Sequence, residues 1–195
     1  MPREGHKFDV AHRRYLDSAE RKAYLDAEGI LRKFRLPKGG RIADVGCGTG
    51  FFALPASTLL GPRGHVYAVD VSEEMLTDLR AKLTHAGRRN VEPILSSEDR
   101  IPLEGACVDF VFMGCVLHEF DGLGTLREAH RILRPAGRLG VVDWKKEDMD
   151  LGPPTAHRLD TEEARALLKE ADFEPVHSFE AGRYHYAIEA RARHS

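Results

Sequence analysis

The chain has 195 residues, the length of one ordinary domain, and is 42% hydrophobic and 31% charged, which is typical of a globular protein and not of a disordered or fibrous one. Its 29 lysines and arginines almost balance its 31 aspartates and glutamates, so the formal net charge is -2. This balance gives no support for a general role on nucleic acids or on membrane surfaces.

Residues 1–17 are polar and show no clear hydrophobic period, so we expect them to form an arm or a lid. Segment 17–34 then repeats apolar residues at three- and four-residue intervals, which predicts an amphipathic helix. Asp17, with Glu20 three positions later, is its expected N-cap. The sequence "LPKGG" ends the helix, and residues 1–35 as a whole are the expected lid.

Short apolar runs alternate with helix-length segments over the next part of the chain. The runs are 41–45, 65–69, 91–95, 108–113 and 138–144. Such alternation predicts a parallel sheet covered by helices on both faces. We therefore expect a three-layer, doubly wound α/β fold with a mostly parallel, seven-stranded sheet once the C-terminal strands are added.

The connecting helices carry their own start and stop signals. Ser72 is the expected N-cap of a helix over 72–87, and a second helix over 122–137 should end at a proline and a glycine. Asp160 and Glu163 form a capping box for a helix over 161–171.

The tail, 173–193, reads as two strands joined through Ala181-Gly182, an antiparallel hairpin at the sheet edge. We expect a single domain over 1–195, with a ligand-binding core at 38–145 and the C-terminal helix and edge hairpin at 146–195.

The stretch "RIADVGCGTGFF" places Gly46, Gly48 and Gly50 directly after the first expected strand. In an open parallel sheet, ligands bind beyond the carboxyl ends of the strands. Glycines let the backbone approach a ligand, and the following helix offers unpaired N–H groups to a charged one. Because proline is tolerated only in a first helical turn, Pro55 indicates that the helix begins within a few residues of Gly50.

The acids around the glycines indicate what kind of ligand this is. A dinucleotide-binding GxGxxG motif would need a glycine where the chain has Phe51. Asp44 stands at the end of the first strand, and Asp70 closes the second, where an acid can accept the hydroxyl groups of a ribose. The pattern predicts a nucleoside with a charged tail, and a nicotinamide-dependent oxidoreductase is the alternative.

Four segments in order carry a family resemblance that covers about residues 38–145. They are "ADVGCGTGFF", "VYAVDVSEEML", "SSEDRIPLEGACVDFVFMGCVLHEF" and "LREAHRILRPAGRLGVVDW". They resemble the class I S-adenosylmethionine-dependent methyltransferases, in particular the small-molecule branch similar to the ubiquinone and menaquinone biosynthesis methyltransferases. The resemblance implies a Rossmann-like fold, S-adenosylmethionine as methyl donor and S-adenosylhomocysteine as product.

The resemblance also implies roles for single residues. Asp44 and the turn Gly46-Cys47-Gly48 would hold the methionine end, Asp70 the ribose, and Val71 with Met75 the adenine. Where the family usually has an acid for the adenine amino group, this chain has Ser97, followed by Glu98 and Asp99. The Ser97–Glu98 pair is the favoured contact, with Asp99 as a substitute. The full expected set is Asp44, Gly46, Cys47, Gly48, Gly50, Phe51, Asp70, Val71, Met75, Ser97, Glu98 and Gly114.

A general base is needed only when the methyl acceptor must first lose a proton. His118, in "GCVLHEF" after the fourth strand, is the candidate; the alternative is a histidine that lines the pocket or caps a helix. Cys47 and Cys115 are expected to be packing residues. Neither the cysteines nor the histidines have the spacing of a metal site, and no metal is expected.

The acceptor is expected to be a small molecule. Larger quinone-type relatives carry an extra segment after the fifth strand, where this chain has only 145–160, so the cover must come from residues 1 to about 30, with Phe8, Tyr15 and Tyr24 as lining. A thin cover suits a compact acceptor, an exposed group on a larger partner, or closure by a second subunit in a homodimer.

Further exclusions narrow the acceptor class. No "NPPY"-like sequence follows the fourth strand, which argues against methylation of nucleobase or glutamine amide nitrogens by the enzymes that use it. From the charge balance, no nucleic-acid partner is expected. The three cysteines do not resemble the paired thiols of arsenite methyltransferases. They favour a cytoplasmic location, and no apolar stretch approaches the roughly 18 residues of a membrane span. A non-catalytic S-adenosylmethionine- or S-adenosylhomocysteine-binding protein is the second alternative.

Overall fold

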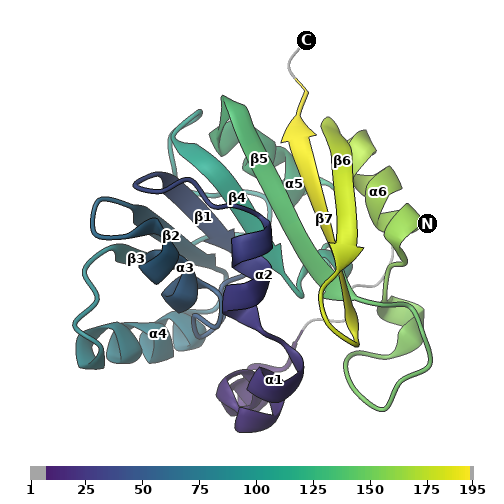
Figure 1. The fold of residues 1–195 in the computed structure, drawn as a ribbon, viewed down its shortest axis with the longest axis horizontal. Coiled ribbons are helices and arrows are strands. Elements are labelled where there is room, and N and C mark those ends of the chain that lie inside the picture. The colour runs from purple at the N-terminus through teal and green to yellow at the C-terminus, as the bar shows by residue number, and fades with distance from the viewer. Residues whose placement is uncertain (1–7, 194–195) are drawn as a thin grey trace.

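The computed structural model describes residues 8–193. Seven strands form one sheet in the order β3-β2-β1-β4-β5-β7-β6 (Figure 1). Strands β1 to β5 are parallel to one another, whereas β7 pairs antiparallel with β5 and β6. The strands are β1 Arg41–Val45, β2 His65–Asp70, β3 Val91–Leu95, β4 Val108–Gly114, β5 Leu133–Trp144, β6 Phe173–Glu180 and β7 His185–Ala192. The expected mostly parallel, seven-stranded sheet with a C-terminal hairpin is confirmed.

Helices cover both faces of the sheet, because neighbouring residues of a strand point to opposite faces. Ile42 packs in the cluster that contains α2, α3 and α4, whereas Ala43 packs in the cluster with α5 and α6. The helices are α1 Ala19–Tyr24, α2 Ala27–Lys33, α3 Ala53–Leu60, α4 Glu73–His85, α5 Gly124–Ile132 and α6 Thr161–Glu170, with 3-10 helices η1 Val10–Asp17, η2 Leu117–Glu119 and η3 Thr155–His157.

The strand order reverses beside β1, whose neighbours are β2 on one side and β4 on the other. At such a reversal the connections leave in opposite directions and open a crevice beyond the carboxyl ends of the strands. Figure 1 shows α1 at this edge of the sheet, away from the layered core. The N-terminal segment therefore lies where a ligand would bind. The expected arm begins in residues 1–7, which lie outside the described residues.

The single helix expected over 17–34 is wrong, because the chain breaks it in two. Leu25 has an extended backbone (φ -130°, ψ 95°) and a buried side chain, and Asp26 caps the second helix by accepting from the Gly29 N–H at 3.0 Å. Burial of Leu25 and a strong N-cap directly after it outweigh the helical pattern.

The N-cap of the first helix is Ser18, whose hydroxyl accepts from the Arg21 N–H at 3.1 Å, and the expectation of Asp17 is wrong. The Asp17 carboxylate instead accepts from Thr49 Oγ1 at 3.0 Å and pairs with Lys82. These contacts tie the N-terminal segment to the turn after β1 and to α4.

The helix expected over 122–137 is also shorter than predicted, since α5 ends at Ile132 and β5 begins at Leu133. Leu133 pairs with Val108 and is buried in the core. Pro135 cannot donate a helical hydrogen bond and disfavours the helical conformation in the residue before it. The predicted strand 138–144 is the second half of this long strand.

The remaining cap predictions are confirmed. Ser72 caps α4 by accepting from the Met75 N–H at 3.3 Å. Asp160 and Glu163 form both hydrogen bonds of the capping box at the start of α6. None of the helices within residues 8–193 is long and apolar enough to cross a bilayer.

Candidate active site

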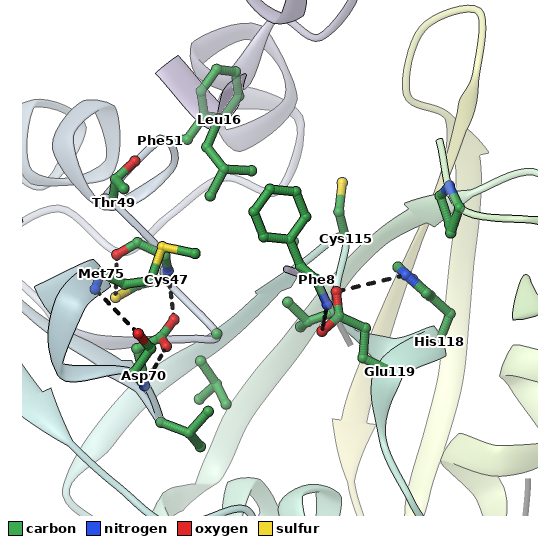
Figure 2. A pocket seen from close by; sticks show the side chains of 18 of the residues that line it. Phe8, Leu16, Cys47, Thr49, Phe51, Asp70, Met75, Cys115, His118 and Glu119 are labelled. Atoms are coloured by element: carbon green, nitrogen blue, oxygen red, sulfur yellow. Dashed lines mark hydrogen bonds and ion pairs between the residues drawn. The ribbon is translucent and has the colours of Figure 1, made fainter. Parts of the chain in front are cut away.

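A cavity of about 1150 Å³ lies at the carboxyl ends of the parallel strands. Its floor comes from the turns after β1, β2 and β4 and from the end of β5. Residues 8–24 form one wall. Figure 2 shows two groups in this cavity: Cys47, Asp70 and Met75 on one side, and Cys115, His118 and Glu119 on the other. We call them the glycine-turn side (residues 44–52 and 70–75) and the histidine side (Cys115, His118, Glu119, Asp143 and Tyr15 with Tyr24).

The turn after β1 has the backbone that its glycines predict. Gly46 and Gly48 adopt φ values of 73° and 53°, which side chains rarely allow. The N–H groups of Gly46 and Cys47 donate to the Val69 carbonyl at 2.8 and 3.0 Å, which binds the turn to β2. As expected, α3 begins at Ala53 with Pro55 in its first turn. Gly46 and Gly48 line the cavity.

Asp70, at the end of β2, links this turn to α4. Its Oδ2 accepts from the Gly48 N–H at 2.7 Å, and its Oδ1 accepts from the Ser72 N–H at 2.9 Å. Burial raises the pKa of Asp70, while the N–H groups of Ser72 and Gly48 oppose that shift. The carboxylate lines the cavity, where its remaining lone pairs can accept hydroxyl hydrogens.

Asp44 and Gly50 lie behind the cavity wall. Asp44 is 2% exposed, and its Oδ2 has no hydrogen-bond partner among the described residues. Burial, followed by repulsion from Asp70, raises the pKa of Asp44 to about 7. A Cβ on Gly50 would lie 2.5 Å from Leu79 Cδ1, so this glycine allows the turn to pack against α4.

The other expected donor-binding residues meet at the cavity. Val71 is 52% exposed, beside the buried Met75. Ser97 and Glu98 lie in the loop after β3 and line the same space, and Ser97 Oγ donates to Asp99 at 3.3 Å. The complete lining from the expected set is Gly46, Cys47, Gly48, Phe51, Asp70, Val71, Met75, Ser97, Glu98 and Gly114.

His118 lies on η2, just beyond β4, and is held from behind by Asp143 of β5. Its Nδ1 is 2.7 Å from Asp143 Oδ1, and its backbone N–H donates to Asp143 Oδ2 at 2.9 Å. Burial alone would lower the pKa of His118, but the charge and hydrogen bond of Asp143, together with the charge of Glu119, raise it overall. An acid behind Nδ1 leaves Nε2 to face a ligand.

Glu119 stands beside His118, with 3.8 Å between its Oε1 and His118 Nε2. Burial raises the pKa of Glu119 to about 7, while His118 and the Phe8 N–H, which donates to its carboxylate at 3.3 Å, oppose this shift. The pair therefore contains a carboxyl group that exchanges protons near neutral pH beside a histidine whose pKa is raised.

Sequence reasoning missed Asp143. The signal was present in "VVDW", where an acid interrupts an otherwise apolar strand that is buried on both faces. A buried carboxylate needs a partner. That partner is His118, 25 positions earlier in the chain, and the spacing alone does not reveal it.

The N-terminal segment covers the cavity with aromatic side chains. The Tyr15 and Tyr24 hydroxyls are 3.3 Å apart, and Tyr24 also packs edge-on against Tyr184 with ring centroids 5.5 Å apart. Burial and then the Tyr15 hydrogen bond raise the pKa of Tyr24. Both tyrosines line the cavity.

Arg21, on the same segment as the tyrosines, was not singled out in the sequence. It also lines the cavity and is 6% exposed.

The cysteines have the environment of packing residues. All three are free thiols. Burial raises the pKa of the Cys47 thiol and raises that of Cys115 to about 12, so both are neutral at physiological pH. Within residues 8–193, no three acidic, histidine or cysteine side chains are grouped closely enough to hold a metal ion.

A glycine turn at the strand reversal, followed by an acid at the end of β2, defines a nucleoside-binding α/β protein. Residues 42–137 match the family model described as "Methyltransferase domain". The solved structure of a SAM-dependent methyltransferase from Aquifex aeolicus is 37% identical, with a TM-score of 0.91 over 94% of this chain and 98% of that one. The chain belongs to the S-adenosylmethionine-dependent methyltransferases.

Curated relatives agree with this family. Demethylmenaquinone methyltransferase from Listeria monocytogenes is 36% identical over 61% of this chain and 51% of its own length. An arsenite methyltransferase from Halobacterium salinarum is 29% identical over 71% of this chain and 38% of its own. The chain spans about half the length, or less, of these curated relatives. The family prediction is confirmed, and nothing in these relatives supports the oxidoreductase or the non-catalytic alternative.

The residues present fit the donor that the family uses. Gly46 and Gly48 line the cavity with backbone alone, and Asp70 lines it at the end of β2. The unpartnered Oδ2 of Asp44 lies directly behind the turn, where a cationic group or a bridging water would satisfy it.

Proposed function

We propose that this protein transfers a methyl group from S-adenosylmethionine to a compact small molecule that loses a proton, and that His118 is the general base. The observation that carries the proposal is the buried 2.7 Å contact between His118 Nδ1 and Asp143 Oδ1 in the cavity beside the glycine turn. A capping or packing histidine would not need a buried acid behind it.

The glycine-turn side is proposed to bind the donor. Gly46, Cys47 and Gly48 offer their backbone to the methionine end, and Asp70 accepts from the ribose. Val71 and Met75 pack against the adenine, near Ser97 and Glu98. Bound S-adenosylmethionine supplies a methyl group already activated on a sulfonium, so the protein mainly aligns the acceptor and excludes water.

The histidine side is proposed to remove the acceptor's proton. With Nδ1 donating to Asp143, the His118 Nε2 lone pair faces the cavity and accepts the proton, and Asp143 stabilises the imidazolium that forms. Glu119, beside Nε2, can pass that proton on to solvent. Asp143 acts through His118 and is a positioning residue.

The acceptor is proposed to be a compact aromatic molecule with an acidic hydroxyl or ring position. The cavity wall carries Phe8, Tyr15, Tyr24 and Trp144, and flat aromatic groups pack well on such side chains. The name of the relative from Listeria, demethylmenaquinone methyltransferase, favours the same class.

The described part of the arm, residues 8–35, is proposed to act as the lid, since Asp17 and the Phe8 N–H tie it to both sides of the cavity.

A cytoplasmic location is proposed because the three cysteines are free. Homodimer formation is proposed from the exposed Val176 on the edge strand β6, and sedimentation velocity measures it.

The test is a screen of metabolite extracts with S-adenosylmethionine carrying a labelled methyl group. We expect label to enter a small aromatic product with wild-type protein and not with His118→Ala. Label that enters only protein or nucleic acid would contradict the proposed acceptor class. Equal labelling by the His118→Ala variant would remove the base from the mechanism.

A further inference from the structure

Arg21 is a buried cation without an ionic partner among residues 8–193. Its side chain is 6% exposed and lines the cavity. One nitrogen, Nη1, donates to the Leu16 carbonyl at 3.2 Å, and the guanidinium lies 4.3 Å from the centre of the Phe51 ring. No carboxylate among residues 8–193 lies within 4.0 Å of it. Because a guanidinium has five N–H donors and a buried charge is costly without a partner, this arrangement suits an anionic ligand.

The contacts of Arg21 place its charge over the glycine turn. Phe51 follows the turn directly, and a Cβ on Gly48 would lie 3.2 Å from Leu16 Cδ1. Leu16 and Phe51 are therefore neighbours of both the guanidinium and the turn, and the charge of Arg21 also reaches Cys115, whose pKa burial raises and this charge lowers. The anion that Arg21 binds should be the end of the ligand that lies against this turn.

Two acids lie at the turn, and Asp70 already accepts from the Gly48 N–H at 2.7 Å. Asp44 lies buried behind the turn with Oδ2 unpartnered, and the charge of Arg21 is among those that lower its pKa. An α-amino acid end carries an ammonium and a carboxylate on the same carbon, which matches a buried acid and a buried arginine near one turn. The histidine side instead carries the acids Glu119 and Asp143, which would repel an anionic acceptor.

We propose that Arg21 binds the α-carboxylate of the methyl donor, and that the lid thereby senses whether the donor is present. This inference rests on the proposed function of the cavity. A planar guanidinium can hold a carboxylate through two parallel hydrogen bonds, and this geometry distinguishes arginine from lysine. Donor binding would then complete a charge pair between the lid and the ligand and hold the lid closed.

The experiment is calorimetry on the full chain with three ligands: S-adenosylhomocysteine, its decarboxylated analogue, and 5′-methylthioadenosine, which has no amino acid end. We expect wild type to bind the decarboxylated analogue at least about tenfold more weakly than S-adenosylhomocysteine. Arg21→Met should lose at least about tenfold for S-adenosylhomocysteine and less than about twofold for the other two ligands. Arg21→Lys should fall between wild type and Arg21→Met.

Lys22→Met is the matched control, because it removes an exposed cation from the same helix, and it should bind all three ligands as wild type does. The proposal is overturned if wild type binds the decarboxylated analogue as tightly as S-adenosylhomocysteine, a result that needs no variant to fold. It is also overturned if folded Arg21→Met retains full affinity for S-adenosylhomocysteine. If wild type binds none of the three ligands, the proposed donor site itself fails.

Discussion

The two sides of the cavity are built in different ways. The glycine-turn side comes from residues 44–52 and 70–75, and its contacts are largely backbone N–H groups held by Val69 and Asp70. The histidine side assembles side chains from η2, β5 and the N-terminal segment, which are far apart in the sequence. The comparison teaches that the proposed donor site is built mainly from two neighbouring strand–turn–helix units, β1–α3 and β2–α4, whereas the proposed proton transfer depends on how distant elements pack.

The sharpest way to separate the two sides is to remove the base. His118→Ala should lower kcat by about 10²–10⁴-fold, the usual contribution of a general base, with S-adenosylhomocysteine affinity within about twofold of wild type. His177→Ala, an exposed histidine on β6, is the control. Loss of donor affinity in step with kcat would show that the two sides are not separable.

Asp143→Asn sharpens the same comparison, because it keeps the size of the side chain but removes its charge. The pKa of His118 should fall without the charge that raises it. The acidic limb of the kcat/KM profile should then move to lower pH, while kcat falls because the imidazolium is no longer stabilised. A lower kcat with an unmoved pH profile would show that Asp143 has only a structural role.

Asp70→Ala tests the glycine-turn side. Each hydrogen bond to a charged group contributes about 1.5–3 kcal/mol, so losing the proposed ribose contact should weaken S-adenosylhomocysteine binding by about 10- to 100-fold in calorimetry. Glu73→Ala, an exposed acid in the first turn of α4, should bind normally. Wild-type affinity of folded Asp70→Ala for S-adenosylhomocysteine would contradict the assignment of Asp70 to the ribose.

Gly46→Ala tests whether the backbone of the turn carries the site. Its φ is 73°, and a Cβ would lie 2.6 Å from Val116 Cγ1. We expect a loss of about 1–3 kcal/mol in the free energy of unfolding by urea. Gly87→Ala has a φ of 60° with nothing within 4 Å of the added Cβ, so it should cost less. Equal losses in the free energy of unfolding for the two variants would show that the contact with Val116 adds nothing to the cost of the positive φ.

The pH dependence of stability compares one acid from each side. Burial raises the pKa of both Asp44 and Glu119 to about 7. The folded state therefore binds more protons than the unfolded state between about pH 4 and 7, and stability should fall as pH rises through that window. Urea unfolding at pH 5 and pH 8 measures this, and Asp44→Asn should flatten the slope. An unfolding free energy that rises from pH 5 to pH 8 would contradict both shifts.

Much of the fold and of the glycine-turn side could be predicted from the sequence because their signals are local. The apolar runs mark strands β1 to β4 to within a residue, and Pro55 marks the start of α3. The errors came where tertiary packing outweighs a local pattern. Burial of Leu25 splits the first helix, and the pairing of Leu133 with Val108 converts the end of a helix into strand.

The histidine side was only partly predictable. His118 stands in a recognisable segment of the sequence. Asp143 and Arg21 can be recognised as site residues only from their contacts, Asp143 with His118 and Arg21 with Phe51, which no sequence spacing reveals. Arg21 is one of 29 lysines and arginines, and nothing in its immediate neighbours distinguishes it from a solvated cation. Its burial in the cavity does.

Titration of S-adenosylhomocysteine into folded wild-type protein, followed by calorimetry, tests the central claim most directly. The glycine turn and Asp70 predict saturable binding with one site per chain, and NADH should give no heat under the same conditions. No heat with S-adenosylhomocysteine from protein shown to be folded would contradict the account. Heat with NADH instead would support a nicotinamide-dependent oxidoreductase.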